Sequence, residues 1–363
     1  MEQYYNRLLT QLEGYTVQGI FQGKRSIKDI VTLQEGTRGR VFFFDQEPMS
    51  KTLDCELWDH IFQEPTIFAN SELNSQDKEY LQENYPNFID WYYFSNAMLS
   101  LEWFDPHKHN YAGWWDHKQT LLDCNLITGS RQYRVYLIHH MYHRGFNNNS
   151  FLSFNGDWDW KKDLELNDQF GLLEHGTFDR IPTEKISYDN WGKDHALYNG
   201  LMQSRIPLDY YSQVNYIFIS ETLCVENKKH LSDKIFKPIA AGKPFVVAAG
   251  VNNLEYLKSY GFCTFNDLWD ESYDQIVDPK QRLDALFDIV DYKINLGEEY
   301  LSDFDPAKPH QTQLEKLDMF DAAHKIARWN REWFWSDEFK DNLFTEAFEN
   351  LEIAKQKLDS MNI

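Results

Sequence analysis

The chain has 363 residues, of which 42% are hydrophobic and 16% aromatic, a composition typical of a globular protein long enough for two domains. Its formal net charge of −21 argues against a broad nucleic-acid-binding surface, although an anionic small molecule needs only a few local cations. The sequence also lacks a signal-peptide pattern, a membrane-length apolar run and closely spaced cysteines, so we expect a cytoplasmic protein with reduced thiols and no membrane insertion.

Short apolar runs in the first third of the chain are typical of buried parallel strands. They are residues 40–46, residues 66–71 and residues 90–99. The aromatic-rich stretch 103–118 that follows has no regular period, and we expect it to be an irregular connection.

The rest of the chain alternates between strand and helix patterns. A strand near Leu126 is followed by a turn at Gly129–Ser130 and a helix, and the tail from Leu314 is amphipathic and helical. This alternation predicts a parallel α/β sheet. From residue 216 onward the predicted elements are a strand at 216–221, a helix at 231–243, a strand at 244–250, a helix at 253–261 and a strand at 262–265.

The predicted elements form two α/β domains followed by C-terminal helices. We place the first domain at residues 1–125, the second at 126–325, and helices that pack back across both at 326–363. Open parallel sheets bind ligands beyond the carboxyl ends of their strands, so the residues that follow each strand are the candidates for chemistry.

The segment 219–249 carries the strongest functional signal. Glu221 follows a predicted strand, and Ser232 stands at a predicted helix N-cap, with Asp233 and Lys234 in the first turn. A cation at this position opposes the helix dipole, and an anionic ligand would resolve that conflict. The alternative is an ordinary capped helix with a solvated lysine.

This segment resembles the donor-site motif of GT-B glycosyltransferases related to the α-1,3-fucosyltransferase-like family. The matching residues are Ser220–Thr222, Ser232–Ile235 and Pro244–Val247, with Asp233 where the family has Glu. Residues 261–265 and 270–274 further along the chain resemble proteins of this kind that are encoded by bacteriophages. The resemblance implies two Rossmann-like domains that face a cleft, with a helical C-terminal tail. Residues 1–125 would then be the acceptor-side domain and residues 126–325 the nucleotide-sugar-binding domain. The resemblance also implies that Glu221 and Lys234 contact the ribose and diphosphate of a nucleotide sugar.

Two arginines follow the predicted turn at Gly129–Ser130. Related transferases carry an arginine here that reaches the phosphates of the sugar donor, so the resemblance adds Arg131 and Arg134 to the donor site. They are one helical turn apart, and guanidinium groups bind phosphate oxygens in a bidentate manner. Solvated arginines on a surface helix are the alternative.

Two carboxylates at the polar end of the run at residues 40–46 and just beyond it are candidates for the catalytic base. An inverting transferase needs one base to deprotonate the acceptor hydroxyl. Glu47 best matches the family's Gly-Glu-Asn before a proline, and Asp45 is the second candidate. A capped turn is the structural alternative.

The resulting hypothesis is an inverting, metal-independent glycosyltransferase without a cofactor, whose co-substrate is a nucleoside-diphosphate sugar. Its acceptor would be a glycan or a hydroxymethylated base in phage DNA, in the cytoplasm of a host cell if the gene is a phage gene. A protein that keeps the fold but not the chemistry is the rival hypothesis. The histidines His139, His140 and His143 are expected in a partly buried helix rather than at a metal, and residues 157–160 in a loop rather than a metal-binding DxD motif.

Overall fold

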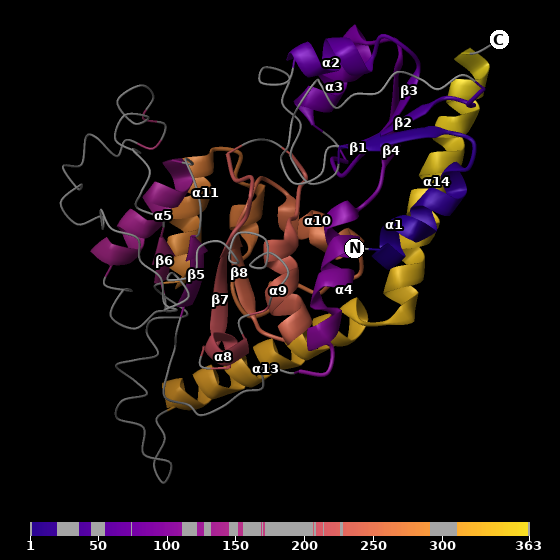
Figure 1. Cartoon of the computed structure of the whole chain (residues 1–363). Helices are drawn as coiled ribbons and strands as arrows, with labels where there is room; N and C mark the ends of the chain where they lie inside the picture. The colour runs from indigo at the N-terminus through magenta and orange to yellow at the C-terminus, as the bar shows by residue number, and fades with distance from the viewer. Residues whose placement is uncertain are drawn as a thin grey trace, which may run out of the picture. The chain divides into compact units, whose positions relative to one another are not determined.

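Within the described residues, the computed structural model contains two four-stranded sheets in which every strand pairing is parallel (Figure 1). The predicted α/β class is therefore confirmed, and the arrangement is compatible with a Rossmann-like fold. The described residues are 2–19, 36–44, 55–73, 75–110, 122–126, 132–144, 152–154, 168, 170, 206, 208–212, 214–225, 228–290 and 311–361.

The contacts within the chain divide it into two compact units. Unit 1 comprises Met1–Asp105, Asn227–Asp233 and Trp335–Ile363, and unit 2 comprises Pro106–Glu226 and Lys234–Phe334. A short piece of unit 1 is thus inserted in the sequence of unit 2. A 3₁₀ turn, η3 (Asp105–His107), lies where the chain first passes from one unit to the other.

Unit 1 is built on a sheet with the strand order β1-β2-β3-β4. Its strands are β1 (Thr16–Gly19), β2 (Arg40–Phe44), β3 (Thr66–Asn70) and β4 (Phe88–Tyr92). Its helices are α1 (Glu2–Leu9), the 3₁₀ helix η1 (Thr10–Leu12), α2 (Cys55–Ile61), α3 (Gln76–Asn84), α4 (Ser95–Phe104) and α14 (Asp337–Met361).

Alternating aromatic side chains make both faces of this sheet apolar. Phe44 contacts Trp58 of α2 on one face, with ring centroids 5.2 Å apart. Phe43 points to the other face and contacts Trp91, whose indole N–H donates to the carbonyl of Ala347 in α14 at 2.9 Å. Because successive strand residues face opposite sides, a continuous apolar run is what a sheet covered on both faces requires.

The predicted strand at residues 90–99 is wrong in its second half. Strand β4 ends at Tyr92, and α4 begins at Ser95. The helix is buried as deeply as the strand, with Ala97 and Leu99 both inaccessible to solvent. The apolar run therefore continues across the boundary, and periodicity does not reveal where the strand ends.

Unit 2 is built on a sheet with the strand order β6-β5-β7-β8. Its strands are β5 (Leu122–Leu126), β6 (Leu152–Phe154), β7 (Tyr216–Ser220) and β8 (Phe245–Ala248). Its helices are α5 (Gln132–His143), α8 (Leu208–Tyr211), α10 (Asn253–Ser259), the 3₁₀ turn η7 (Ser272–Gln275), α11 (Pro279–Ile289) and α13 (Gln311–Phe334). Helix α9 (Asp233–Ala241) begins with the last residue of the inserted piece of unit 1 and continues in unit 2.

The core of unit 2 forms where these helices cover the sheet. Phe218 of β7 stacks on Phe287 of α11 at 6.0 Å, and Tyr216 contacts Phe320 of α13 at 5.4 Å between ring centroids. Helix α5 lies beside α11 (Figure 1), where the Tyr136 hydroxyl donates to Asp284. The strand and helix order predicted from residue 216 onward is confirmed as far as α10.

The predicted strand at residues 262–265 is not a strand in the structure. Instead, the buried side chain of Asn330 accepts from the Cys263 N–H and donates to the Cys263 carbonyl, each at 2.8 Å. One side-chain amide thereby makes the two bonds that a neighbouring strand would make. The C-terminal helical prediction is confirmed by α13 and α14.

Candidate ligand-binding site

The sheet of unit 2 reverses its strand order between β5 and β7. The chain goes from β5 outward to β6, and the next strand among the described residues, β7, pairs with the opposite side of β5. Such a reversal is the topological switch point at which open parallel sheets bind ligands, beyond the carboxyl ends of the two central strands. Three of the predicted site residues, Arg134, Glu221 and Lys234, follow these two strands in the sequence of unit 2.

Arg134 and Tyr133, in the first turn of α5, are tied to the end of β7. The Arg134 Nε donates to the Tyr133 hydroxyl at 3.1 Å, and that hydroxyl donates to the Glu221 carbonyl. The Arg134 Nη2 lies 3.4 Å from the same carbonyl oxygen. Only 4% of Arg134 is exposed, so its guanidinium contacts the protein backbone rather than projecting into solvent.

Glu221 is fully buried directly after β7. Its backbone N–H donates to the Ala248 carbonyl at 2.9 Å, which extends the pairing of β7 with β8 by one residue. Its carboxylate accepts from the Thr222 N–H at 3.0 Å. This local bond fixes the direction of the chain as it leaves the strand.

Lys234 lies in the first turn of α9 and turns toward the same loop. Its Nζ donates to the Thr222 hydroxyl at 3.2 Å. The half-buried ammonium therefore lies beside the residue that follows Glu221. The structure brings Arg134, Glu221 and Lys234 together around residues 221–222.

The residues that precede Lys234 have the placement that the sequence predicts for a helix start. Ser232 immediately precedes α9, and Asp233 is its first residue. Both are buried. By its contacts this pair belongs to unit 1, whereas Lys234 belongs to unit 2.

The helix after β8 begins differently. The Asp274 carboxylate accepts from the Leu254 N–H at 3.1 Å and from the Glu255 N–H at 3.4 Å in the first turn of α10. Burial raises the pKa of this carboxyl group, and the backbone bonds oppose that shift. A protein carboxylate thus already holds the anion-binding position of α10.

Three predicted site residues lie outside the described residues: Asp45, Glu47 and Arg131. The last described residue before the two carboxylates is Phe44, at the carboxyl end of β2. The histidines of α5 follow the helical prediction, with His139 buried and His143 exposed. Among the residues described, no group of three or more His, Cys, Asp or Glu side chains could hold a metal ion.

Sequence reasoning missed two residues that shape this edge of the sheet. Tyr133 relays the Arg134 contact to Glu221, and its only signal was its place next to that arginine in the first turn of a predicted helix. Arg282 of α11 donates to the carbonyl of Ala249 after β8 at 3.0 Å and to that of Cys224 after β7. It therefore links the loops that follow the two strands.

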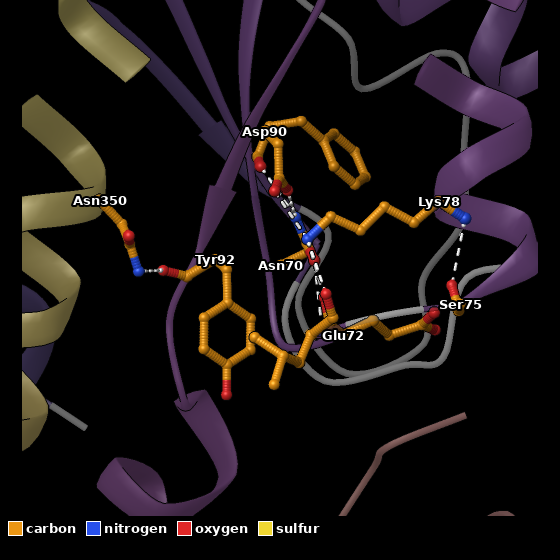
Figure 2. A network of polar contacts seen from close by, with 9 residues as sticks. Asn70, Glu72, Ser75, Lys78, Asp90, Tyr92 and Asn350 are labelled. Atoms are coloured by element: carbon orange, nitrogen blue, oxygen red, sulfur yellow. Dashed lines mark hydrogen bonds and ion pairs between the residues drawn. The ribbon is translucent and has the colours of Figure 1, made fainter. Parts of the chain in front are cut away.

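A second polar cluster lies at the carboxyl end of β3 in unit 1, and Figure 2 shows it from close by. The Lys78 ammonium forms an ion pair with Asp90 at 2.6 Å and donates to the Glu72 carbonyl at 3.0 Å. The Asn70 side chain donates to Asp90 at 2.8 Å and accepts from the Glu72 N–H at 3.2 Å. Both backbone groups of Glu72 are therefore fixed.

Comparisons with protein-family models, with curated proteins and with solved structures find no match to this chain. Among the helices that the structure describes, none combines the length and apolar character needed to cross a bilayer.

Proposed function

We propose that the chain is a glycosyltransferase that binds a nucleoside-diphosphate sugar at the carboxyl end of β5 and β7 in unit 2. The two-domain GT-B arrangement, an inverting reaction and independence of metal ions are part of this proposal. The acceptor hydroxyl would be activated by Glu47, with Asp45 as the second candidate, from the sequence that follows β2 in unit 1.

The observation that carries the proposal is the convergence at the switch point. Lys234, in the first turn of α9, lies 3.2 Å from the hydroxyl of Thr222, and Tyr133 and Arg134 bond the carbonyl of the preceding residue. These residues come from the segments after both central strands. This is the position at which parallel α/β sheets bind nucleotides.

The chemistry of this edge suits a diphosphate. The first turn of a helix attracts anions through its N–H groups and its dipole, and Lys234 adds a full positive charge there. In the transfer reaction, the bond between the anomeric carbon and the diphosphate oxygen breaks, and negative charge develops on that oxygen. A fixed cation and helix N-terminus would stabilise this leaving group.

Arg134 would serve the site indirectly. Its guanidinium is bonded to Tyr133 and to the Glu221 carbonyl, so it fixes the end of β7 in place of a direct phosphate contact. Of the two arginines predicted from the resemblance, Arg131 is then the candidate for contact with the phosphates.

The proposal is tested by nucleotide binding. Thermal unfolding is measured with UDP- and GDP-sugars and, as a monophosphate comparison, with CMP-sugars, since a ligand bound only by the folded state raises its stability by about 2.7 kcal/mol at a hundred times its Kd. Calorimetry with the nucleotide that stabilises the protein then compares Lys234→Ala with Lys325→Ala. Lys325 is the matched control because it is a lysine of unit 2 on the exposed side of α13, paired with Asp321.

We expect Lys234→Ala to lose nucleotide binding with little change in melting temperature, and Lys325→Ala to bind normally. Equal affinity of the two variants would reject Lys234 as a phosphate ligand. A wild-type protein that is stabilised by none of the nucleotide sugars would reject the proposed activity. A binding protein without catalysis would bind the donor but release no nucleoside diphosphate in the presence of glycan or hydroxymethylated DNA.

A further inference from the structure

The segment that leads into α9 is held by unit 1, although the chain on both sides of it belongs to unit 2. Residues 228–233 are buried with the exception of Lys229, which is half-buried. A connection between a strand and a helix of the same sheet normally runs over the surface. The burial of this one calls for a specific explanation.

Lys228 is the charged anchor of the segment. Its Nζ lies 2.6 Å from the Asp77 carboxylate and 3.3 Å from that of Glu72. The side chains of Lys228 and Glu72 are only 7% and 2% exposed. A second bond holds the segment three residues further on, where the Asn96 amide donates to the Leu231 carbonyl at 3.0 Å.

The two residues whose carboxylates bind Lys228 have a fixed backbone. The N–H of Glu72 donates to the Asn70 side chain, and its carbonyl accepts from Lys78, which is paired in turn with Asp90 (Figure 2). Asp77 lies in the first turn of α3. The two partners of Lys228 therefore lie just after the carboxyl end of β3 and in the first turn of α3.

A buried ion pair is a weak source of stability, since apolar side chains of the same volume often stabilise as well or better. The pair instead provides positional specificity, because each buried charge is compensated only when its partner lies within ion-pair distance. Six residues after Lys228, the chain reaches Lys234 in the first turn of α9. Asp233 and Lys234 share that turn, so the segment anchored at Lys228 runs directly into it.

We propose that Lys228, held by Glu72 and Asp77, is a positioning residue that orders the first turn of α9 and thereby sets the affinity of Lys234 for a diphosphate. The second half of this inference rests on the proposed function. The first half, the order of the turn, does not.

The test compares three variants by amide hydrogen exchange and by calorimetry. Lys228→Met removes the charge at nearly constant volume, and Lys228→Arg restores it. Leu351→Ala is the control for stability alone, because removing this buried side chain leaves a cavity in unit 1. Leu351 lies in α14, in a different part of the sequence from the segment. Exchange is followed at residues 233–237, and affinity is measured with UDP and GDP.

We expect Lys228→Met to exchange about tenfold faster in the first turn of α9 and to bind the nucleotide about tenfold more weakly, equivalent to about 1.4 kcal/mol. Lys228→Arg should show exchange in this turn and an affinity for the nucleotide that are both close to those of the wild type. Leu351→Ala should lower the melting temperature and leave both the exchange in this turn and the affinity unchanged.

Unchanged exchange in Lys228→Met, or a change equal to that in Leu351→Ala, would overturn the positioning role. Faster exchange with unchanged affinity would overturn the link to the ligand. If wild-type protein binds neither UDP nor GDP, the proposed donor site and the ligand half of the inference fail together. The exchange comparison still decides whether Lys228 orders the turn.

Discussion

Replacing Arg282 with methionine should destabilise unit 2 more than any surface substitution, because four backbone carbonyls share its guanidinium. Its Nε donates to Ala249 at 3.0 Å, its Nη1 to Ile276 and Val277, and its Nη2 to Cys224. The side chain is buried, with 2% exposed. One residue therefore satisfies carbonyls from the loops after β7, β8 and η7.

The magnitude follows from the number and burial of these bonds. A hydrogen bond to a charged group contributes about 1.5–3 kcal/mol, and bonds to one shared group are not additive. Removal of the guanidinium also takes a cation away from Asp274, whose pKa is already raised by burial. We expect Arg282→Met to lower the free energy of unfolding by roughly 3–5 kcal/mol.

Arg282→Lys separates charge from geometry. It keeps the positive charge near Asp274, but a single ammonium presents its donors from one point and does not span three loops. We expect a loss of roughly 2 kcal/mol. Urea unfolding followed by both tryptophan fluorescence and far-ultraviolet circular dichroism measures these values, since two probes reveal whether the units unfold separately. A loss below about 1 kcal/mol for Arg282→Met would refute the reasoning, because that is the size of one neutral hydrogen bond.

Three further predictions concern stability. Gly261→Ala should destabilise by more than about 1 kcal/mol, since the residue has φ of +84° and a Cβ would lie 2.9 Å from the Trp333 ring; thermal unfolding measures this. Leu351→Ala should cost about 2–5 kcal/mol in urea unfolding through the cavity it leaves. Burial lowers the pKa of His324 from 6.5 to about 4, so its unfolded state binds the extra proton. The contribution of His324 to the free energy of unfolding should then fall by about 3 kcal/mol as the pH falls from 6.5 to 4. Burial lowers the pKa of His140 to about 4 as well, so His140 should add a loss of similar size, and His324→Phe with His140→Phe should flatten the dependence.

The elements of unit 2 from β7 to α10 were predictable because each carries a local signal. The run at β7 is apolar and ends in polar residues, and Gly242 follows α9 with the positive φ, +72°, that the end of a helix requires. The predicted N-cap position, Ser232, was right for the same reason: a short polar side chain before an apolar period marks a helix start.

The parts that the sequence did not predict depend on partners far along the chain. Lys228 and Glu72 are 156 residues apart, and nothing near Lys228 indicates that it is buried against a carboxylate. The same holds for Asn330, whose side chain replaces a strand partner for Cys263 at a separation of 67 residues. Local pattern is informative about which element forms, but it does not identify which polar side chain will be paired in the core.

The position of Lys234 is best explained by comparing the first turns of the helices of unit 2. Helices α10 and α11 begin on protein carboxylates, Asp274 and Asp278, which complement the helix dipole. Helix α9 has Asp233 followed by Lys234, whose charge opposes the dipole by about 0.3–1 kcal/mol. Helix α11 also has a lysine in its first turn, Lys280, but that side chain pairs with Asp284 of the same helix at 2.8 Å. A solvated lysine would serve equally well elsewhere on the surface, whereas this one turns back toward Thr222 at the switch point of the sheet. A cation kept where helix stability favours an acid, and where parallel sheets bind their ligands, is what the proposed anionic substrate would require.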